Sequence, residues 1–132
     1  MGIIAVELVI LIREQDVNRT IARGDIVWIS GQLGHNEKRE LPEGMDEQMK
    51  QTYANIKELL SRFEMNMDHV VEEVIYTMDM ATTFDARKNF NTEYYSDPKM
   101  VASTMVGVTG LALPGQLVEV IVLQVSSKDQ QV

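Results

Sequence analysis

The strand-forming segments of this chain are nearly continuous apolar runs, with little alternation between apolar and polar residues. The clearest examples are DIVWISG, which ends at Gly31, and LVEVIVLQV, which contains Glu119. Strands with this pattern are typically buried on both faces of their sheet. The pattern constrains the fold strongly, because something must cover each face.

The sequence predicts the order βββ-α-β-α-ββ. The strands are expected in the opening IIAVELVILI segment, on either side of residues 23–25, over 70–79, and in STMVGVTGL and LVEVIVLQV around Pro114-Gly115. One helix is expected to begin near Asp46, because apolar residues follow at helical spacing: Met49, Tyr53, Ile56, Leu60 and Phe63. A second is expected over 83–94, burying Phe84, Phe90 and Tyr94.

Two helices among so many strands predict an α+β fold, with both helices on one face of a single sheet. The length of 132 residues favours one domain spanning residues 1–132. Two helices cannot cover both faces of the sheet. We therefore expect a second subunit to cover the other face, which makes the protein an oligomer.

Composition excludes several classes of function. The chain has no cysteine, so it has no thiolate nucleophile and no cysteine-ligated metal. Its 20 acidic and 12 basic residues give a net charge of −8, which disfavours nucleic acid and anionic membranes as partners. The opening apolar run is too short for a membrane span and lacks the basic flank of a signal peptide. We expect a cytoplasmic protein.

Few residues in the sequence are candidates for chemistry. Glu119 lies inside an apolar strand, where an ionised carboxylate is costly unless it is paired or hydrated. It is either a carboxylate at a hydrated subunit seam or salt bridge, or a pocket group that orients a water or exchanges a proton with a ligand. The residues alone leave these two alternatives open.

Other polar residues are expected to have ordinary structural roles. His35 and His69 have no companions at the spacing of a metal site, so no metal is expected. Glu72 and Glu73 lie near the start of their predicted strand, where exposure is common. Trp28 is expected to be a core aromatic rather than a ligand-stacking residue, and so is Tyr76 from the residues alone.

Four segments together resemble the Rid family, the reactive intermediate deaminases also called RidA/YjgF. They are GDIVWISGQLG, QTYANIKELL, DHVVEEVIYTMDM and STMVGVTGLALPGQLVEV, in the family's order and spacing across residues 17–126. The resemblance implies a chorismate-mutase-like fold with a single mixed sheet. It also implies a homotrimer around a central β-barrel, with ligand clefts between subunits.

The resemblance further implies hydrolysis of enamines and imines to keto acids and ammonia, without a cofactor. Glu119 matches the family's water-holding glutamate, Gly31 matches the glycine of the SGQ-type segment, and Tyr76 falls where an aromatic is common. Ser103 stands where the family has its carboxylate-binding arginine, and Met105 stands where cysteine or threonine is frequent.

The arginine-to-serine difference has a physical cost. A bidentate guanidinium–carboxylate pair is charge-assisted, whereas serine supplies one neutral hydroxyl. Its loss costs about 2–5 kcal/mol of binding if nothing compensates. One hypothesis is that Arg19, on the strand face of Val17, supplies a cation to the cleft. The alternative is a solvent-facing Arg19 paired with Asp16 or Asp25.

Three functions follow from these features. The first is a cofactor-free imine or enamine deaminase, supported by Glu119 and Gly31. The second is a metabolite-binding or regulatory trimer without turnover, supported by Ser103. The third, a ribonuclease, is disfavoured by the net charge and the absence of a basic stripe.

Overall fold

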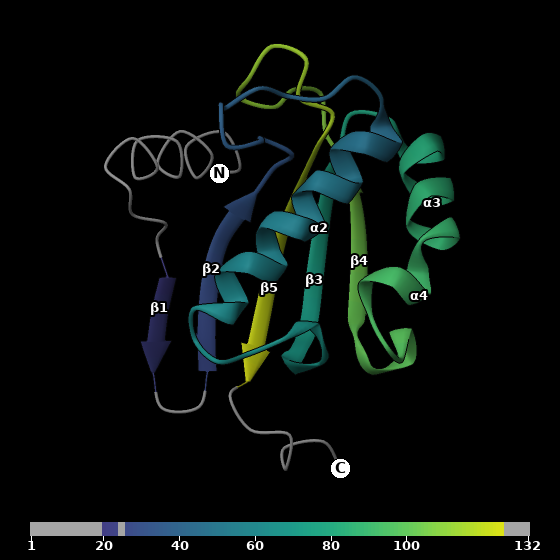
Figure 1. Cartoon of the computed structure of the whole chain (residues 1–132). Coiled ribbons are helices and arrows are strands. Elements are labelled where there is room, and N and C mark those ends of the chain that lie inside the picture. The colour runs from purple at the N-terminus through teal and green to yellow at the C-terminus, as the bar shows by residue number, and fades with distance from the viewer. Residues whose placement is uncertain (1–19, 24–25, 126–132) are drawn as a thin grey trace.

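The computed structural model describes residues 20–23 and 26–125 and contains one mixed five-stranded sheet (Figure 1). The strand predicted in the opening IIAVELVILI segment lies outside the described residues. The strands follow the spatial order β1-β2-β5-β3-β4, where β3 and β4 are parallel and the other neighbours are antiparallel. Their bounds are Thr20–Arg23 (β1), Ile26–Gln32 (β2), Val70–Thr77 (β3), Ala102–Gly107 (β4) and Val118–Val125 (β5).

Helices connect the strands on one side of the sheet, as expected for an α+β fold. The bounds are Met45–Ser61 (α2), Met80–Asn89 (α3) and Asn91–Tyr94 (α4), with 3₁₀ turns at Met67–His69 and Pro98–Met100. The helix predicted over 83–94 begins three residues earlier, because the Asp79 side chain caps it by accepting a hydrogen bond from the Thr82 amide. It is also divided at Phe90, so the structure has a short additional helix.

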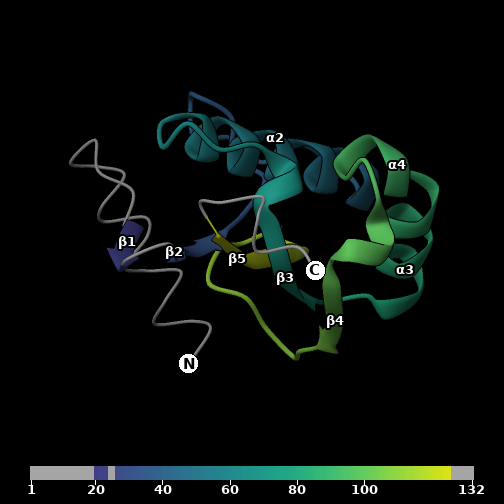
Figure 2. The same ribbon diagram turned by 90° about the horizontal axis from the view of Figure 1, so that it is seen from below.

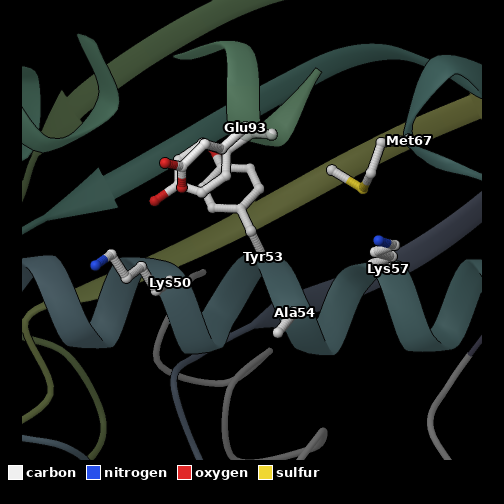
Figure 3. Close-up of a pocket in the computed structure, with 7 residues that line it drawn as sticks. Lys50, Tyr53, Ala54, Lys57, Met67 and Glu93 are labelled. Atoms are coloured by element: carbon white, nitrogen blue, oxygen red, sulfur yellow. The ribbon is translucent and has the colours of Figure 1, made fainter. Parts of the chain in front are cut away.

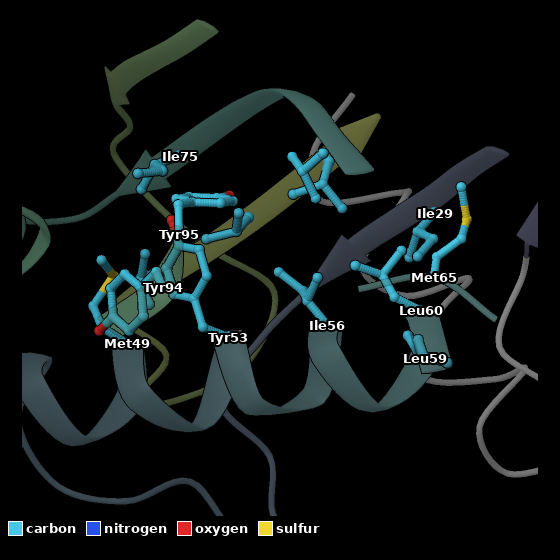
Figure 4. Packing of buried hydrophobic residues seen from close by; sticks show 14 of the residues in the cluster. Ile29, Met49, Tyr53, Ile56, Leu59, Leu60, Met65, Ile75, Tyr94 and Tyr95 are labelled. Carbon is cyan, nitrogen blue, oxygen red and sulfur yellow. The ribbon is translucent and has the colours of Figure 1, made fainter. Parts of the chain in front are cut away.

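The apolar stripe of α2 forms the centre of the core, as its spacing predicts. Met49, Tyr53, Ile56 and Leu60 are buried against the sheet (Figure 4). The prediction that Phe63 belongs to this stripe is wrong, since 42% of Phe63 is exposed. The helix ends at Ser61, so Phe63 no longer follows the helical period.

The buried face of α3 differs from the prediction. Tyr94 is buried and Phe90 is partly buried, but Phe84 is 59% exposed. The residues of α3 that face inward are Thr83, Ala86 and Arg87. The sequence pattern missed this face because its polar members bind polar partners beneath them, described below.

The sheet has a second face, opposite the helices (Figure 2). No helix among the described residues covers it. The strand register places eight largely half-exposed apolar residues on this face: Ile26, Trp28, Val74, Tyr76, Val106, Ile121, Leu123 and Val125. Trp28, expected in the core, is 41% exposed here. Among the described residues, helices therefore pack on only one face of the sheet.

Candidate functional site

Glu119 and Gly31 lie in direct proximity on neighbouring strands. Gly31 belongs to an irregular part of β2, where the pairing with β5 shifts register between Ile29 and Gln32. A Cβ atom at Gly31 would lie 2.7 Å from Cδ of Glu119 and 2.8 Å from its Oε1. Glycine at this position therefore leaves the space that the Glu119 carboxyl group occupies.

The carboxyl group of Glu119 has an unusual environment. The residue is fully buried, and neither of its oxygens has a hydrogen-bonding partner among the described residues. Burial raises the pKa of Glu119 to about 7. Both protonation states are thus populated near neutral pH, which is what a group that accepts and returns a proton requires.

Tyr76 lies beside Glu119, as the two are directly opposed residues of β3 and β5. Directly opposed residues place their side chains on the same face of a sheet. Tyr76 is half-buried on the face away from the helices. The structure thus brings together Gly31, Tyr76 and Glu119, three of the residues predicted for the site.

Ser103 and Met105 lie on the other face of the sheet. In the parallel pair β3–β4, Ser103 is opposite Glu73 and Met105 is opposite Ile75, and both of these β3 residues are buried beneath the helices. Tyr76 follows Ile75 directly, so its side chain points the opposite way. Within one chain, the structure therefore does not bring Ser103 and Met105 together with Glu119.

A cavity of about 410 Å³ lies between α3 and the edge strand β4. Ser103 and Met105 contribute to its wall from β4. The other lining residues come from α3, from its continuation and from the 3₁₀ turn before β4: Phe84, Arg87, Lys88, Asn91, Pro98 and Lys99. This cavity has the size of a pocket for a small molecule.

Behind this cavity, Glu73 is the centre of a buried polar network. Its Oε1 accepts hydrogen bonds from the hydroxyls of Tyr53 at 2.6 Å and Tyr95 at 2.8 Å. Its Oε2 accepts from Nε of Arg87 at 2.8 Å and from the hydroxyl of Ser103 at 2.5 Å. Four donors thus replace the water that this fully buried carboxylate has lost.

The expectation that Glu73 is exposed is wrong. The sequence contained a signal that would have corrected it, because Glu73 and Ile75 are two residues apart and therefore share a strand face. Since Ile75 belongs to the core, Glu73 must also point inward. The identity of its partners was beyond this pattern, because the four partners come from four different segments.

The network shifts the titration of its members. Burial and the neighbouring Glu73 carboxylate both raise the pKa of Tyr53 and of Tyr95, which keeps these phenols protonated as donors. Burial alone would lower the pKa of Arg87, but the Glu73 carboxylate raises it and the net direction is upward. The Glu73–Arg87 contact is therefore a buried ion pair, with the Arg87 side chain only 11% exposed.

A second cavity, of about 310 Å³, lies on the helical side between α2 and α4 (Figure 3). Lys50, Tyr53 and Lys57 line it from α2, and Glu93 and Tyr94 line it from α4. The rings of Tyr53 and Tyr94 stack, with centroids 3.9 Å apart. None of the residues predicted for the site lines this cavity.

Other predictions about the site concern metals, membranes and Arg19. Among the described residues, no group of three histidine or acidic side chains is placed to hold a metal ion. His35 and His69 are both buried, and Nδ1 of His69 accepts a hydrogen bond from the Asn66 amide. None of the described helices is long and apolar enough to cross a membrane. Arg19 lies outside the described residues.

Comparisons with known proteins identify the family of this chain. Residues 14–125 match the family model described as endoribonuclease L-PSP. The chain is 26% identical over 102 residues to the RutC family protein YjgH of Escherichia coli K12, which covers 77% of this chain and 78% of that protein.

Solved structures have the same fold. The structure of protein YjgH matches with a TM-score of 0.76 and 24% identity, covering 87% of each chain. The Rid protein YyfA of Yersinia pestis, described as a protein of unknown function, matches with a TM-score of 0.73 and 24% identity, covering 80% of this chain and 84% of that one. The family model, the shared sheet topology and these relatives together show that the chain belongs to the endoribonuclease L-PSP family, which includes the YjgF and Rid proteins.

Proposed function

We propose that this protein binds a small metabolite in clefts between subunits and hydrolyses an enamine or imine there to a keto acid and ammonia. Water adds to the imine carbon, and the resulting carbinolamine then expels ammonia. The reaction needs one group that takes a proton from water and later returns it to the departing nitrogen.

The observation that carries the proposal is the state of Glu119. Its carboxyl group is buried, has no hydrogen-bonding partner among the described residues, and has a pKa of about 7. A purely structural carboxylate in a core would normally be paired. An unpaired one, beside a glycine that leaves room for it, suits the holding of a water and the transfer of its proton.

The site would be completed by a neighbouring subunit. Glu119, Gly31 and Tyr76 lie on one face of the sheet, whereas Ser103 and Met105 lie on the other. Two such half-sites can meet only when a second chain brings its open face against the edge of the first. The apolar residues of that face supply a reason to associate, because their exposure to water is unfavourable. We propose the homotrimer that the family resemblance implies.

The alternative is a trimer that binds a metabolite without turnover. Ser103 supports it, since this residue cannot form the bidentate charge-assisted contact of an arginine. Its hydroxyl also donates its only proton to Glu73. Without another anchor, the substrate would be held too loosely for an efficient reaction.

A ribonuclease activity, which the description of the family model suggests, has less support. The net charge of −8 opposes the approach of a polyanion. The cavity between α3 and β4 has three cationic lining residues, too few to form a stripe along which a phosphate backbone could lie.

The direct test measures the pyruvate released from 2-aminoacrylate generated in the assay. The deaminase proposal predicts that the protein accelerates release and that Glu119→Gln removes the acceleration. The matched control is Glu72→Gln, which changes an exposed glutamate on the same sheet face. Binding of 2-oxobutanoate with no acceleration by the wild-type protein would support the non-catalytic alternative.

A further inference from the structure

The cavity between α3 and β4 concentrates positive charge. Three of its lining residues are cationic, namely Arg87, Lys88 and Lys99, and none is acidic. Glu73 behind the lining balances the charge of Arg87, so the two lysines supply the net positive charge. This distribution is notable because the chain as a whole carries a net charge of −8. A cleft lined by one sign of charge attracts ligands of the opposite sign.

Arg87 differs from the two lysines because it is held in one position. Its Nε donates to Oε2 of Glu73 at 2.8 Å, and its Nη1 donates to Oδ1 of Asn91. Its Nη2 has no hydrogen-bond acceptor among the described residues. The guanidinium is therefore fixed from behind, and Arg87 is one of the residues that line the cavity. A ligand that binds it loses less conformational freedom than one that binds a mobile lysine.

Ser103 cannot act as a second hydrogen-bond donor to an anion beside Arg87. The hydroxyl proton of Ser103 is directed at Glu73, so Ser103 has no proton left to donate to an anion. Ser103 and Arg87 share the same carboxylate oxygen, which places the guanidinium of α3 next to the start of β4. The positive group thus reaches the wall of the cavity from the helix instead of from the strand.

We infer that Arg87 anchors the carboxylate of a small organic acid in this cavity. Lys88 and Lys99 add positive potential around it. Phe84, which is 59% exposed, and Met105 offer apolar surface to the rest of the acid. The cavity volume of about 410 Å³ suits an acid of a few carbon atoms. This inference rests on the proposed function in that it names the residue that would hold the carboxylate of the substrate.

The first test requires no variant. The full-length protein is titrated with 2-oxobutanoate and, separately, with 2-butanone, its neutral counterpart without the carboxylate, while the NMR amide shifts are followed. We expect the acid to bind at least tenfold more tightly and to shift the signals of Arg87, Ser103 and Met105. Equal affinity for both probes, or no binding of the acid at millimolar concentration, would overturn the inference.

Variants then separate the anchor from the surrounding charge. Arg87→Gln is expected to weaken acid binding at least tenfold. Because this change leaves Glu73 buried and unpaired, the double variant Glu73→Gln/Arg87→Met removes both charges and keeps the side-chain volumes similar. The matched control is Arg62→Gln, since Arg62 is an exposed arginine paired with Glu58 outside the cavity. Wild-type acid affinity in either folded Arg87 variant would overturn the inference.

Failure of this inference is distinguishable from failure of the proposed function. Glu119→Gln is expected to abolish release of pyruvate from 2-aminoacrylate and to leave the affinity for 2-oxobutanoate within twofold. If the wild-type protein hydrolyses 2-aminoacrylate while Arg87→Gln retains the same KM and kcat, the deaminase proposal survives and Arg87 is not the anchor. If the acid binds through Arg87 without any turnover, the inference stands and the deaminase proposal fails.

Discussion

The carboxyl group of Glu119 occupies the space in which a side chain at Gly31 would lie, with only 2.7 Å between Cδ and the position of a Cβ atom. Gly31→Ala must therefore displace this carboxyl group. The obstacle is the end of a flexible side chain, so we expect the fold to survive. A displacement of about 1 Å at a reacting group lowers the rate by about 100-fold. Measurement of kcat and of the thermal midpoint checks both expectations.

The control for this substitution is Gly110→Ala. A Cβ atom at Gly110 would meet nothing within 4 Å. This variant should retain wild-type activity. A Gly31→Ala protein with normal activity would contradict the assignment of Glu119 to the reaction.

The raised pKa of Glu119 makes stability depend on pH. Its ordinary value is 4.5 and its value in the folded chain is about 7, so the folded state binds the proton more tightly. The associated stability is complete below about pH 4.5 and is lost as the pH rises through 7. The loss is on the order of 3 kcal/mol. Glu119→Gln should abolish this loss and unfold at higher urea concentration than the wild type at pH 8.

Urea unfolding at pH 5 and pH 8 checks this prediction. The difference between Glu119→Gln and the wild type should be smaller at pH 5, because Glu119 is still protonated in the folded chain there and most of the loss develops between pH 5 and pH 7. Glu72→Gln, which alters an exposed carboxylate, serves as the control and should follow the wild type at both values. An equal effect of Glu119→Gln at both values would contradict the raised pKa.

Much of the fold could be predicted because apolar spacing determines which face of an element is buried. The period of α2 correctly placed Tyr53 and Ile56 in the core, whereas the expectation that a second subunit covers the long apolar strands stays a prediction. The same logic failed at Phe63 and Phe84. Phe63 lies beyond the end of α2 and therefore leaves its apolar stripe. Phe84 lies outside the inward face of α3, which is largely polar.

The candidate site could be predicted only in part. Glu119 was identifiable because a carboxylate inside an apolar strand is costly, and Gly31 was identifiable from the family resemblance. The partnership of Glu73 with Arg87 was not identifiable. It depends on how α3 packs over β3, and sequence periodicity carries no information on which helix residue meets which strand residue. A polar residue that shares a strand face with core residues indicates that a buried polar contact of this kind is present.

The tyrosines around Glu73 provide a prediction with an internal control. Tyr53→Phe and Tyr95→Phe each remove a hydroxyl that donates to Glu73, and each should lower the free energy of unfolding by about 1.5–3 kcal/mol. Tyr94 stacks on Tyr53, but its buried hydroxyl has no partner among the described residues. Tyr94→Phe should therefore leave stability unchanged or increase it. Denaturant unfolding of the three variants measures the contrast, and equal losses in all three would contradict the network.

The apolar face opposite the helices leads to a prediction about assembly. Trp28 lies on this face and is 41% exposed in the single chain. A subunit that covers the face would bury this side chain, so Trp28→Glu would place an unpaired charge in the interface. We expect the wild type to have three times the 15.0 kDa mass of the chain, and the variant to dissociate to monomers at micromolar concentration.

Sedimentation equilibrium measures this mass, and Phe63→Glu is the matched control. Phe63 is 42% exposed, nearly the same fraction as Trp28, but it lies beyond the end of α2 and outside the open sheet face. Because both substitutions replace a half-exposed aromatic by a glutamate, they change charge and solubility alike. Only Trp28→Glu should alter the mass, while circular dichroism reports whether each chain keeps its fold. A wild-type protein that sediments as a monomer, or a Trp28→Glu variant that remains trimeric, would show that this face is not the interface.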